Sequence, residues 1–501
     1  MKAENSNKVQ KGVKVFLPFY LFTSLLFFVA VILFFGLAYP HHLHYQEQYQ
    51  LFLFDSTYVW EIVRHPGGVA DMLGRFCTQF FLFAWVGAAI IAVLLSAVQL
   101  LTLLLIDHSP LTIDHSAAHS KANNVQWSMV NVQWTYGLSF VPSFLLWLFL
   151  LDENALLGGV WAVLLTLLAI WGLSRLHGGW IRRILIIIAI PILYWMVGPA
   201  WDGTHYHRYP TVVPVLLYAA WLSAIILPLL MRLIVKGKKQ EKSSVAKYSL
   251  SSFLFSLSSF ILVSVVMGTL VWKNANFKAE KVMQYDFMAC HQQWNRILET
   301  VNAEKPNNQI GVTVQNLALA MRGMLLAHMF DYNQNSIHGL LPDVKEDATS
   351  PMPTAEAFYQ LGMINVAQRT VFEAQEAILD FQKSGRCYKR LAQTNLINGQ
   401  YEVARKYLMA LQKTLFYRDW ANETLPLLGN EKAVASHPEY GRLRLCAYNE
   451  DFYFSDHVTP EMLESLYYRN TDNRMAYQYL LAYCMLTGDQ ERYNRIISKE
   501  Q

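Results

Sequence analysis

Two carboxylates stand among apolar and aromatic residues near the N-terminus, and they are the residues best suited to acid–base chemistry. The stretch that contains them, residues 40–75, reads PHHLHYQEQYQLFLFDSTYVWEIVRHPGGVADMLGR. A carboxyl group that is partly desolvated beside aromatic rings has a raised pKa, which suits it to accept a proton. We therefore take Glu47 and Asp55 as candidate catalytic residues. The alternative is that both acids are the hydrated faces of surface helices.

Three arginines occur in the same region or in a second polar loop: Arg64, Arg75 and Arg208. A guanidinium group can donate to two oxygens of a phosphate and keeps its charge at every physiological pH. These arginines are therefore candidate phosphate-binding residues. Alternatively, they anchor the loops to anionic lipid headgroups.

Histidine and aspartate residues of the two loops could bind a divalent metal ion, because imidazole nitrogen and carboxylate oxygen are common ligands. They are His41, His42, His44, Asp202, His205 and His207. Their spacing matches no metal-binding motif, and histidines at a membrane surface are also common for reasons of solvation. A divalent metal therefore stays an open alternative, and no cofactor is assigned.

Composition and charge indicate what kind of protein contains these candidate residues. The 501 residues are 53% hydrophobic and 16% charged, whereas soluble proteins have about 25% charged residues. Residues 1–273 contain 18 Lys and Arg against 11 Asp and Glu, and residues 274–501 contain 23 against 26. This asymmetry excludes a single soluble domain and a disordered chain. We expect an all-α protein with a transmembrane domain at 1–273 and an extracytoplasmic helical domain at 274–501.

Seven apolar segments of the first domain are candidate membrane spans, since a bilayer core of about 30 Å needs about 20 helical residues. They cover 15–39, 76–106, 137–151, 156–174, 181–200, 211–233 and 249–272. The third segment is short and contains Pro142, so it could be a half-span. Lys and Arg are concentrated in alternate loops, which places the N-terminus in the cytoplasm and the C-terminal domain outside a bacterial inner membrane.

Residues 40–75 would then form an outer loop between the first two spans. Its mixture of polar and apolar residues predicts two short interfacial helices, Tyr45 to Phe54 and Tyr58 to Val63. The Pro-Gly-Gly sequence that starts at Pro66 should break the chain before the second span.

The C-terminal domain contains an internal repeat of helical character. Residues 358–378 align with 388–408 at a spacing of 30 residues, with Gly362 opposite Ala392, and a weaker copy covers 474–498. The pattern resembles the tetratricopeptide repeat (TPR), in which paired helices approach each other at small residues.

The resemblance to the TPR implies a solenoid that binds peptides or protein surfaces. For such a groove we expect Tyr388, Asn395 and Tyr401 to contact a protein partner. A purely structural cap is the alternative. Four cysteines of this domain could pair if it lies in an oxidising compartment, but buried free thiols are the default expectation at such helix positions.

The layout of the whole chain resembles the GT-C superfamily of membrane glycosyltransferases. The resemblance rests on a cytoplasmic N-terminus, one span, an outer loop with early acids and the sequence His65-Pro66-Gly67, further spans and an outer C-terminal domain. It implies a polyprenyl-phosphate-linked sugar as donor and a loop carboxylate, Glu47 or Asp55, near the acceptor. The loop and the repeats also look like a family of uncharacterised bacterial inner-membrane proteins.

Three function classes follow from these observations. The first is a GT-C-like glycosyltransferase, and the second is a non-catalytic envelope scaffold whose TPR-like domain binds a protein partner. A secondary transporter is disfavoured, because the spans contain almost no charged residues at mid-membrane. The chain has no P-loop and no His-Glu-x-x-His sequence, which argues against an ATP-driven pump and a zincin. Nucleic-acid binding is not expected, since the basic residues lie in short loops between apolar segments.

Overall fold

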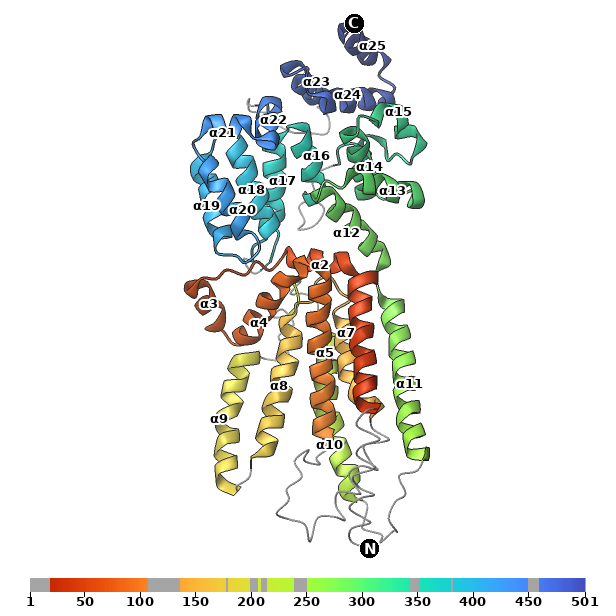
Figure 1. Ribbon diagram of the computed structural model, residues 1–501, viewed down its shortest axis with the longest axis vertical. Coiled ribbons are helices and arrows are strands. Elements are labelled where there is room, and N and C mark those ends of the chain that lie inside the picture. Colours follow the sequence, from red (N-terminus) through yellow and green to blue (C-terminus); the bar gives the residue numbers. More distant parts are fainter. Residues whose placement is uncertain are drawn as a thin grey trace. The chain divides into compact units, whose positions relative to one another are not determined.

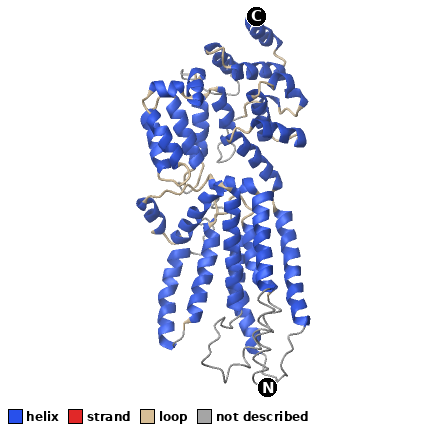
Figure 2. Ribbon diagram, in the orientation of Figure 1, coloured by secondary structure: helices blue, strands red, loops and turns tan. Residues whose placement is uncertain are grey.

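The computed structural model describes residues 19–106, 136–176, 179–198, 206–208, 214–237, 250–342, 351–379, 382–448 and 459–500. Within these ranges the protein is all-α, as expected, and contains no strand (Figure 2). Contacts divide the chain into two units. The membrane unit comprises Met1–Gln46 and Ser56–Asn276, and the helical unit comprises Glu47–Asp55 and Phe277–Gln501.

The membrane unit is a bundle of helices (Figure 1). Its first helix covers Phe19–Ala38 and ends in the π-helical turn η1 (Phe34–Ala38). The elements that follow are α2 (Pro40–Glu47), α3 (Ser56–Val63), α4 (Gly68–Thr78), η2 (Gln79–Leu82), α5 (Ala84–Ile106), η4 (Gly137–Phe140), α7 (Val141–Phe149), α8 (Gly158–Arg175), α9 (Gly179–Val197), α10 (Val215–Gly237) and α11 (Leu250–Asn274).

Four helices of the described residues are long and apolar enough to cross a membrane, fewer than the seven segments that the sequence predicts. They are Phe19–Ala38, Ala84–Ile106, Gly158–Arg175 and Leu254–Asn274. The other three segments contain shorter apolar helices, at Gly137–Phe149, Arg183–Val197 and Val215–Met231. The third segment, with Pro142 in the first turn of α7 (Val141–Phe149), forms a short helix, which agrees with the half-span that the sequence allowed.

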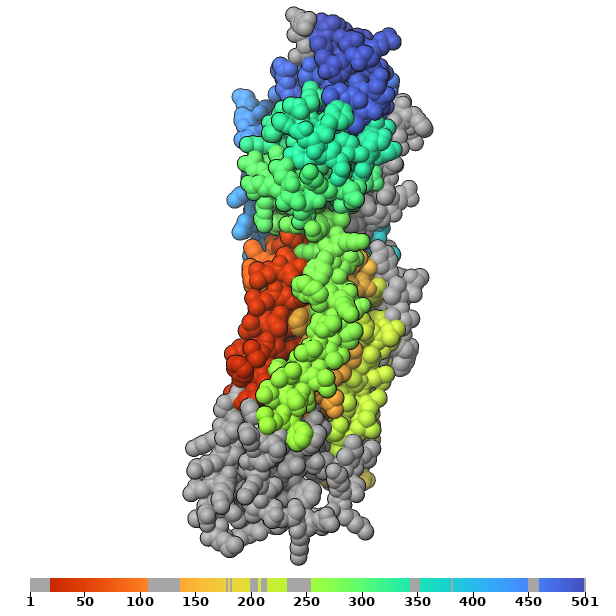
Figure 3. All heavy atoms as spheres, turned by 90° about the vertical axis from the view of Figure 1, so that its right-hand side faces the viewer, coloured from red at the N-terminus to blue at the C-terminus, as the bar shows by residue number. Residues whose placement is uncertain are grey.

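Apolar side chains on α11 face outward, as expected for a helix in contact with lipid. Leu262 is 66% exposed and Val265 is 61% exposed, and Figure 3 shows the atoms of α11 along one face of the membrane unit. An exposed apolar surface of this kind is costly in water. The fold is therefore compatible with a membrane protein.

The outer loop differs from the expectation in two places. Residues 50–55 are not helical, so the expected interfacial helix from Tyr45 to Phe54 is wrong, whereas α3 at Ser56–Val63 forms as expected. The second span begins at Ala84 rather than at residue 76, because η2 and an extended Phe83 separate it from α4. Gly67, with a φ of 85°, provides the expected break before α4.

The helical unit consists of α-helices joined by short turns. They are α12 (Phe277–Cys290), α13 (Trp294–Glu304), α14 (Gln309–Met321), α15 (Leu325–His328), α16 (Pro351–Leu361), α17 (Ile364–Glu376), α18 (Gly385–Ile397), α19 (Tyr401–Gln412), α20 (Arg418–Thr424), α21 (Glu431–Ser436), α22 (Pro438–Cys446), α23 (Thr459–Arg469), α24 (Arg474–Thr487) and α25 (Gln490–Glu500). Three 3₁₀ turns complete it: η6 (Met329–Asp331), η7 (Ser336–Gly339) and η8 (Leu425–Leu427).

Helical hairpins form where the repeat predicts them, but in a different register. Helices α16 and α17 pack as one pair and α18 and α19 as the next. Each pair turns at a glycine with positive φ, Gly362 at 91° and Gly399 at 75°. Gly362 is therefore equivalent to Gly399 and not to Ala392, which is buried within α18. The 30-residue spacing compared residue types alone. It therefore paired Gly362, which lies in a turn, with Ala392, which packs inside a helix.

We predict that Gly74→Ala destabilises the membrane unit, because α4 and α8 cross there with their backbones in contact. A methyl group at Gly74 would overlap the backbone of Gly158. Overpacking of this kind costs about 1–3 kcal/mol, which should lower the melting temperature in detergent. Gly172→Ala in α8 is the matched control, since a methyl group there meets no atom within 4 Å. Equal melting temperatures for the two variants would contradict the close crossing.

Candidate functional site

The segment Glu47–Asp55 of the outer loop belongs, by its contacts, to the helical unit, and we call it the strap. Its backbone is bound at two points: the Leu51 amide donates to the Lys383 carbonyl at 2.9 Å, and the Phe54 amide donates to the Lys413 carbonyl at 2.6 Å. Lys383 precedes α18, and Lys413 caps the C-terminus of α19. The final carbonyls of a helix lack partners within the helix. The strap therefore satisfies one of them.

Leu51 is the apolar anchor of the strap. It is 7% exposed and packs with Ala392, Leu408, Leu411 and Ala421, which come from α18, α19 and α20. Full burial of a leucine side chain contributes about 1.5–3 kcal/mol. Neighbouring aromatic residues, among them Tyr388, Tyr407, Tyr417 and Trp420, close around this cluster. The strap thus completes a hydrophobic core that three helices of the helical unit leave open at one end.

Glu47 lies at the start of the strap and is only 5% exposed. The Tyr417 hydroxyl, which lies just before α20, faces both carboxylate oxygens at 3.1 and 3.3 Å and donates to them. The ring of Tyr417 lies against Gly385, where a methyl group would overlap it. A glycine at the first position of α18 therefore allows Tyr417 to reach the acid.

Arg386 connects the strap to the first helix of the helical unit. Its guanidinium group binds Asp286 of α12 through two hydrogen bonds, at 2.5 and 2.8 Å, and also donates to the Gln48 side chain at 3.4 Å. Both members of the ion pair are largely buried, with 10% and 14% of their side chains exposed. Breaking a buried pair by removing one partner is strongly destabilising. Arg386 is therefore held in place beside the strap.

Asp55 forms an ion pair at the opposite end of the strap. Its Oδ2 accepts a hydrogen bond from the Lys413 Nζ at 2.6 Å. Half of the Lys413 side chain is exposed, and exposed pairs of this kind contribute about 0–1 kcal/mol. The Asp55–Lys413 pair therefore adds little to the free energy of unfolding, although its opposite charges match.

Burial raises the pKa of Glu47 to about 7, although the hydrogen bond from Tyr417 and the charge of Arg386 act in the opposite direction. Burial and the neighbouring Glu47 carboxylate raise the pKa of Tyr417 well above its usual value, so its hydroxyl keeps its proton. Glu47 is therefore an acid that changes its charge near neutral pH. Its carboxylate could accept a proton, but both oxygens face a tyrosine within a packed region.

The three candidate phosphate-binding arginines lie in the membrane unit and have different surroundings. Arg75 forms an ion pair with Asp71 one helical turn earlier in α4, at 2.7 Å. Arg208 is 5% exposed, donates to the Glu153 carbonyl at 2.7 Å and lies over the ring of Tyr45. Arg64 is exposed at the end of α3 and donates to the adjacent His65. Each arginine thus has different contacts within the membrane unit.

The candidate metal ligands do not form a metal site within the part of the chain that the structure describes. His207 instead binds Asp152 at 2.9 Å, and His42 contacts the Leu150 carbonyl at 3.0 Å. The Asp152 contact, with a bridge between Ala155 and His207, fixes residues 206–208 against the loop after α7. Asp202 and His205 lie outside the described residues.

All three candidate partner-binding residues make contacts within the helical unit. Asn395 is 1% exposed and binds the Leu391 carbonyl and the Gln368 side chain. Tyr388 belongs to the aromatic residues around Leu51. Tyr401 is partly exposed and contacts Glu431 and Arg444.

Helix α22 packs against α16 and α18. Arg442 donates to the Gln360 side chain at 3.0 Å, and Tyr359 donates to Glu439 at 2.9 Å.

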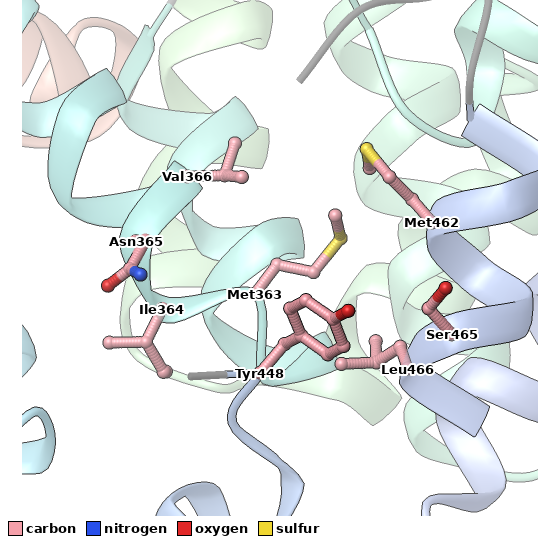
Figure 4. Close-up of a pocket in the computed structure, with 8 residues that line it drawn as sticks. All are labelled: Met363, Ile364, Asn365, Val366, Tyr448, Met462, Ser465 and Leu466. Atoms are coloured by element: carbon pink, nitrogen blue, oxygen red, sulfur yellow. The ribbon is translucent and has the colours of Figure 1, made fainter. Parts of the chain in front are cut away.

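A groove on the helical unit is lined by apolar residues at the start of α17 and on α23. Figure 4 shows Met363, Tyr448 and Leu466 close together within it. Its free volume is about 40 Å³, whereas sites for small-molecule ligands typically have roughly 300–1,000 Å³. The groove is too small to hold a sugar donor or a lipid.

The residues that hold the strap were missed by sequence reasoning, because Tyr417, Arg386 and Lys413 lie more than 300 positions after it. The available signal was the amphipathic sequence from Gln48 to Asp55, which alternates polar and apolar residues and then reads LFLFD. Such a sequence is also typical of an extended segment bound to an apolar surface.

We predict that Glu47→Gln removes a pH-dependent penalty. The folded-state pKa of Glu47, about 7, lies above its usual value of 4.5, so charging the buried acid costs stability. The cost is absent below pH 4.5, grows between pH 4.5 and 7 and is complete above pH 7. Relative to wild type, the variant should gain up to about 3 kcal/mol at pH 8 and nearly nothing at pH 4.5.

Thermal unfolding of the two proteins at both pH values measures this difference. Glu402→Gln on the exposed surface of α19 is the control and should change neither value. A gain that is the same at both pH values would show that Glu47 is not a buried titrating acid.

Comparison with known proteins finds one protein family. It is a family of unknown function, DUF6057, and it matches residues 16–202 and 199–499. The comparison shows neither a glycosyltransferase family nor a TPR family. No curated protein and no solved structure matches the chain. Because the two matches together cover nearly the whole sequence, the protein belongs to the DUF6057 family of unknown function.

Proposed function

We propose that the protein is a non-catalytic scaffold of the cell envelope, in which the membrane unit anchors a helical unit that binds a protein partner. On this proposal the helical unit is TPR-like and lies on the outer side of a bacterial inner membrane. The observation that carries the proposal is the set of contacts that Glu47 and Asp55 make. Both acids contact residues of the helical unit: Glu47 accepts a hydrogen bond from Tyr417, and Asp55 pairs with Lys413.

The contacts of these acids explain why their residue types are present without catalysis. Glu47 accepts from Tyr417 in a nearly dry environment, and Asp55 pairs with Lys413. A general base must reach the proton that it removes within hydrogen-bonding distance. Glu47 has only 5% of its surface exposed, which leaves an acceptor hydroxyl little room to approach it.

Covalent connectivity also supports a scaffold. The chain passes between the two units at Gln46–Glu47, at Asp55–Ser56 and at Asn276–Phe277. A single linker would suffice to attach a domain to a membrane, whereas here the outer loop contributes a segment to the core of the helical unit. Residues 47–55, which come between two helices of the membrane unit in the sequence, are therefore part of the helical unit.

The glycosyltransferase hypothesis stays a prediction. It would need Glu47 or Asp55 to leave its partner and approach a donor phosphate held by Arg64, Arg75 or Arg208. The contacts of the acids favour the scaffold, so we base the proposal on that hypothesis.

We predict that the double variant Glu47→Gln, Asp55→Asn restores a strain that lacks the gene as well as wild type does. Both replacements keep a hydrogen-bonding side chain of the same shape, so the strap stays bound. Leu51→Asp, which places a charge in the apolar cluster, should fail to restore the strain. Leu445→Asp is the matched control, because Leu445 is 73% exposed and should tolerate the charge.

The same proteins, purified in detergent, would be assayed for transfer of a labelled sugar from a polyprenyl phosphate. The scaffold predicts no transfer by any of them. Transfer by wild type that falls about 10²- to 10⁴-fold in the double variant, at an unchanged melting temperature, would contradict the scaffold and support a transferase.

A further inference from the structure

Helix α3 is held at the C-terminal end of α9 within the membrane unit. The Gly67 amide, in the turn between α3 and α4, donates to the Trp195 carbonyl of α9 at 2.8 Å. A methyl group at Gly68 would overlap the Ile62 carbonyl, so the last turn of α3 packs directly against the start of α4. Figure 1 shows α3 beside α4 at this end of α9. The last turn of α3 therefore lies close to the level of Trp195.

The side chains of α9 indicate where the hydrocarbon region of a bilayer would end on this unit. Ile187 and Ile190, in the middle of the helix, are 68% and 63% exposed, whereas the exposed residues near its C-terminal end are Tyr194 and Trp195. Trp and Tyr are enriched where the hydrocarbon core meets the lipid headgroups. Trp195 therefore marks the headgroup level, and α3 is held at that level.

One side of α3 packs toward α4. The residues on this side are half-buried, and they are Tyr58, Val59, Ile62 and Val63. Tyr58 accepts a hydrogen bond from Arg75 of α4, and Arg75 also pairs with Asp71. These contacts fix the rotation of α3 about its axis, so its other side faces away from α4.

The side of α3 that faces away from α4 combines an aromatic ring with a cation. Trp60 is 64% exposed, and Arg64 is also exposed. The two residues are four positions apart and therefore share one side of the helix. An indole ring has an apolar body and a polar N–H group, which suits the headgroup region. A guanidinium group can donate to two oxygens of a phosphate. Glu61, the other exposed charge of α3, is turned about 100° from Trp60.

We propose that Trp60 and Arg64 form a binding site for the headgroup of an anionic phospholipid, which we call the headgroup site. The Trp60 ring lies among the headgroups, and Arg64 binds the lipid phosphate. The level of α3 favours a lipid over a protein partner, since a protein would have to enter the headgroup region to reach it. This inference rests on the membrane anchorage in the proposed function, and it adds the class of lipid that the anchor recognises.

The test uses the full-length protein with Trp60→p-benzoylphenylalanine, a photo-crosslinking amino acid. The protein is reconstituted into vesicles of equal parts phosphatidylcholine and phosphatidylglycerol and illuminated, and intact mass spectrometry identifies any lipid that is added. We expect lipid adducts in which phosphatidylglycerol is favoured about fivefold, the effect of one basic side chain near an anionic surface. Addition of Arg64→Gln should remove this preference.

Two controls separate the headgroup site from general properties of the protein. Arg405→Gln removes the same charge from α19, where the side chain is 45% exposed, and should leave the lipid preference unchanged. The crosslinker at Ile190 of α9 should give lipid adducts without a preference, because it meets acyl chains. All variants change exposed residues and should keep the wild-type melting temperature.

Absence of lipid adducts at Trp60, with adducts present at Ile190, would overturn the headgroup site and leave the proposed function standing. Equal adducts of the two lipids, or a preference that persists in Arg64→Gln, would also overturn it. In native membranes, an adduct of Trp60 with a protein instead of a lipid would assign α3 to a protein interface. Absence of lipid adducts at Ile190 as well would contradict the membrane anchorage itself, and with it both proposals.

Discussion

The burial of the strap against α18, α19 and α20 is the interaction on which the helical unit depends. Leu51 closes an apolar cluster that these three helices leave open, and the Phe54 amide satisfies the carbonyl of Lys413 at the end of α19. An open apolar cluster at a helix end would expose both unpaired carbonyls and hydrophobic surface to water. Residues 47–55, which come between two helices of the membrane unit in the sequence, thus form a structural part of the helical unit.

Charge and burial work against each other at this contact. Burial of the Leu51 side chain stabilises the contact. Burial of Glu47 destabilises it when the acid is charged, and for this reason burial raises the pKa of Glu47 to about 7. A chain selected only for stability would have a glutamine at that position. A titratable acid therefore costs stability, and it makes strap binding sensitive to pH.

Sequence reasoning identified the fold class, the apolar helices and the presence of helical hairpins, because these depend on local composition and periodicity. It also selected Glu47 and Asp55 as unusual, since acids among aromatic residues stand out. It assigned helix to Tyr45–Phe54, although α2 ends at Glu47 and residues 50–55 are not helical. The helix signal is local, whereas Leu51 is held by residues more than 300 positions away.

The repeat register failed for a related reason. Similar residue types recur at a spacing of 30 residues, but the turns lie at Gly362 and Gly399, where the backbone has a positive φ. A comparison of residue types alone does not contain this backbone requirement. The partners of Glu47 were equally hidden. Tyr417 reaches the acid only because Gly385 leaves room for its ring, and no single-residue pattern in the sequence reports that contact.

The most direct test of this account is hydrogen–deuterium exchange at the amides of Leu51 and Phe54 in the wild-type protein. Both amides donate to carbonyls of the helical unit, so the account predicts exchange about 100-fold or more slower than in an isolated peptide of the same sequence. The same amides should lose this protection in Leu51→Asp. Exchange of both amides at the rate of the free peptide would contradict the central claim, because the strap would then not be bound.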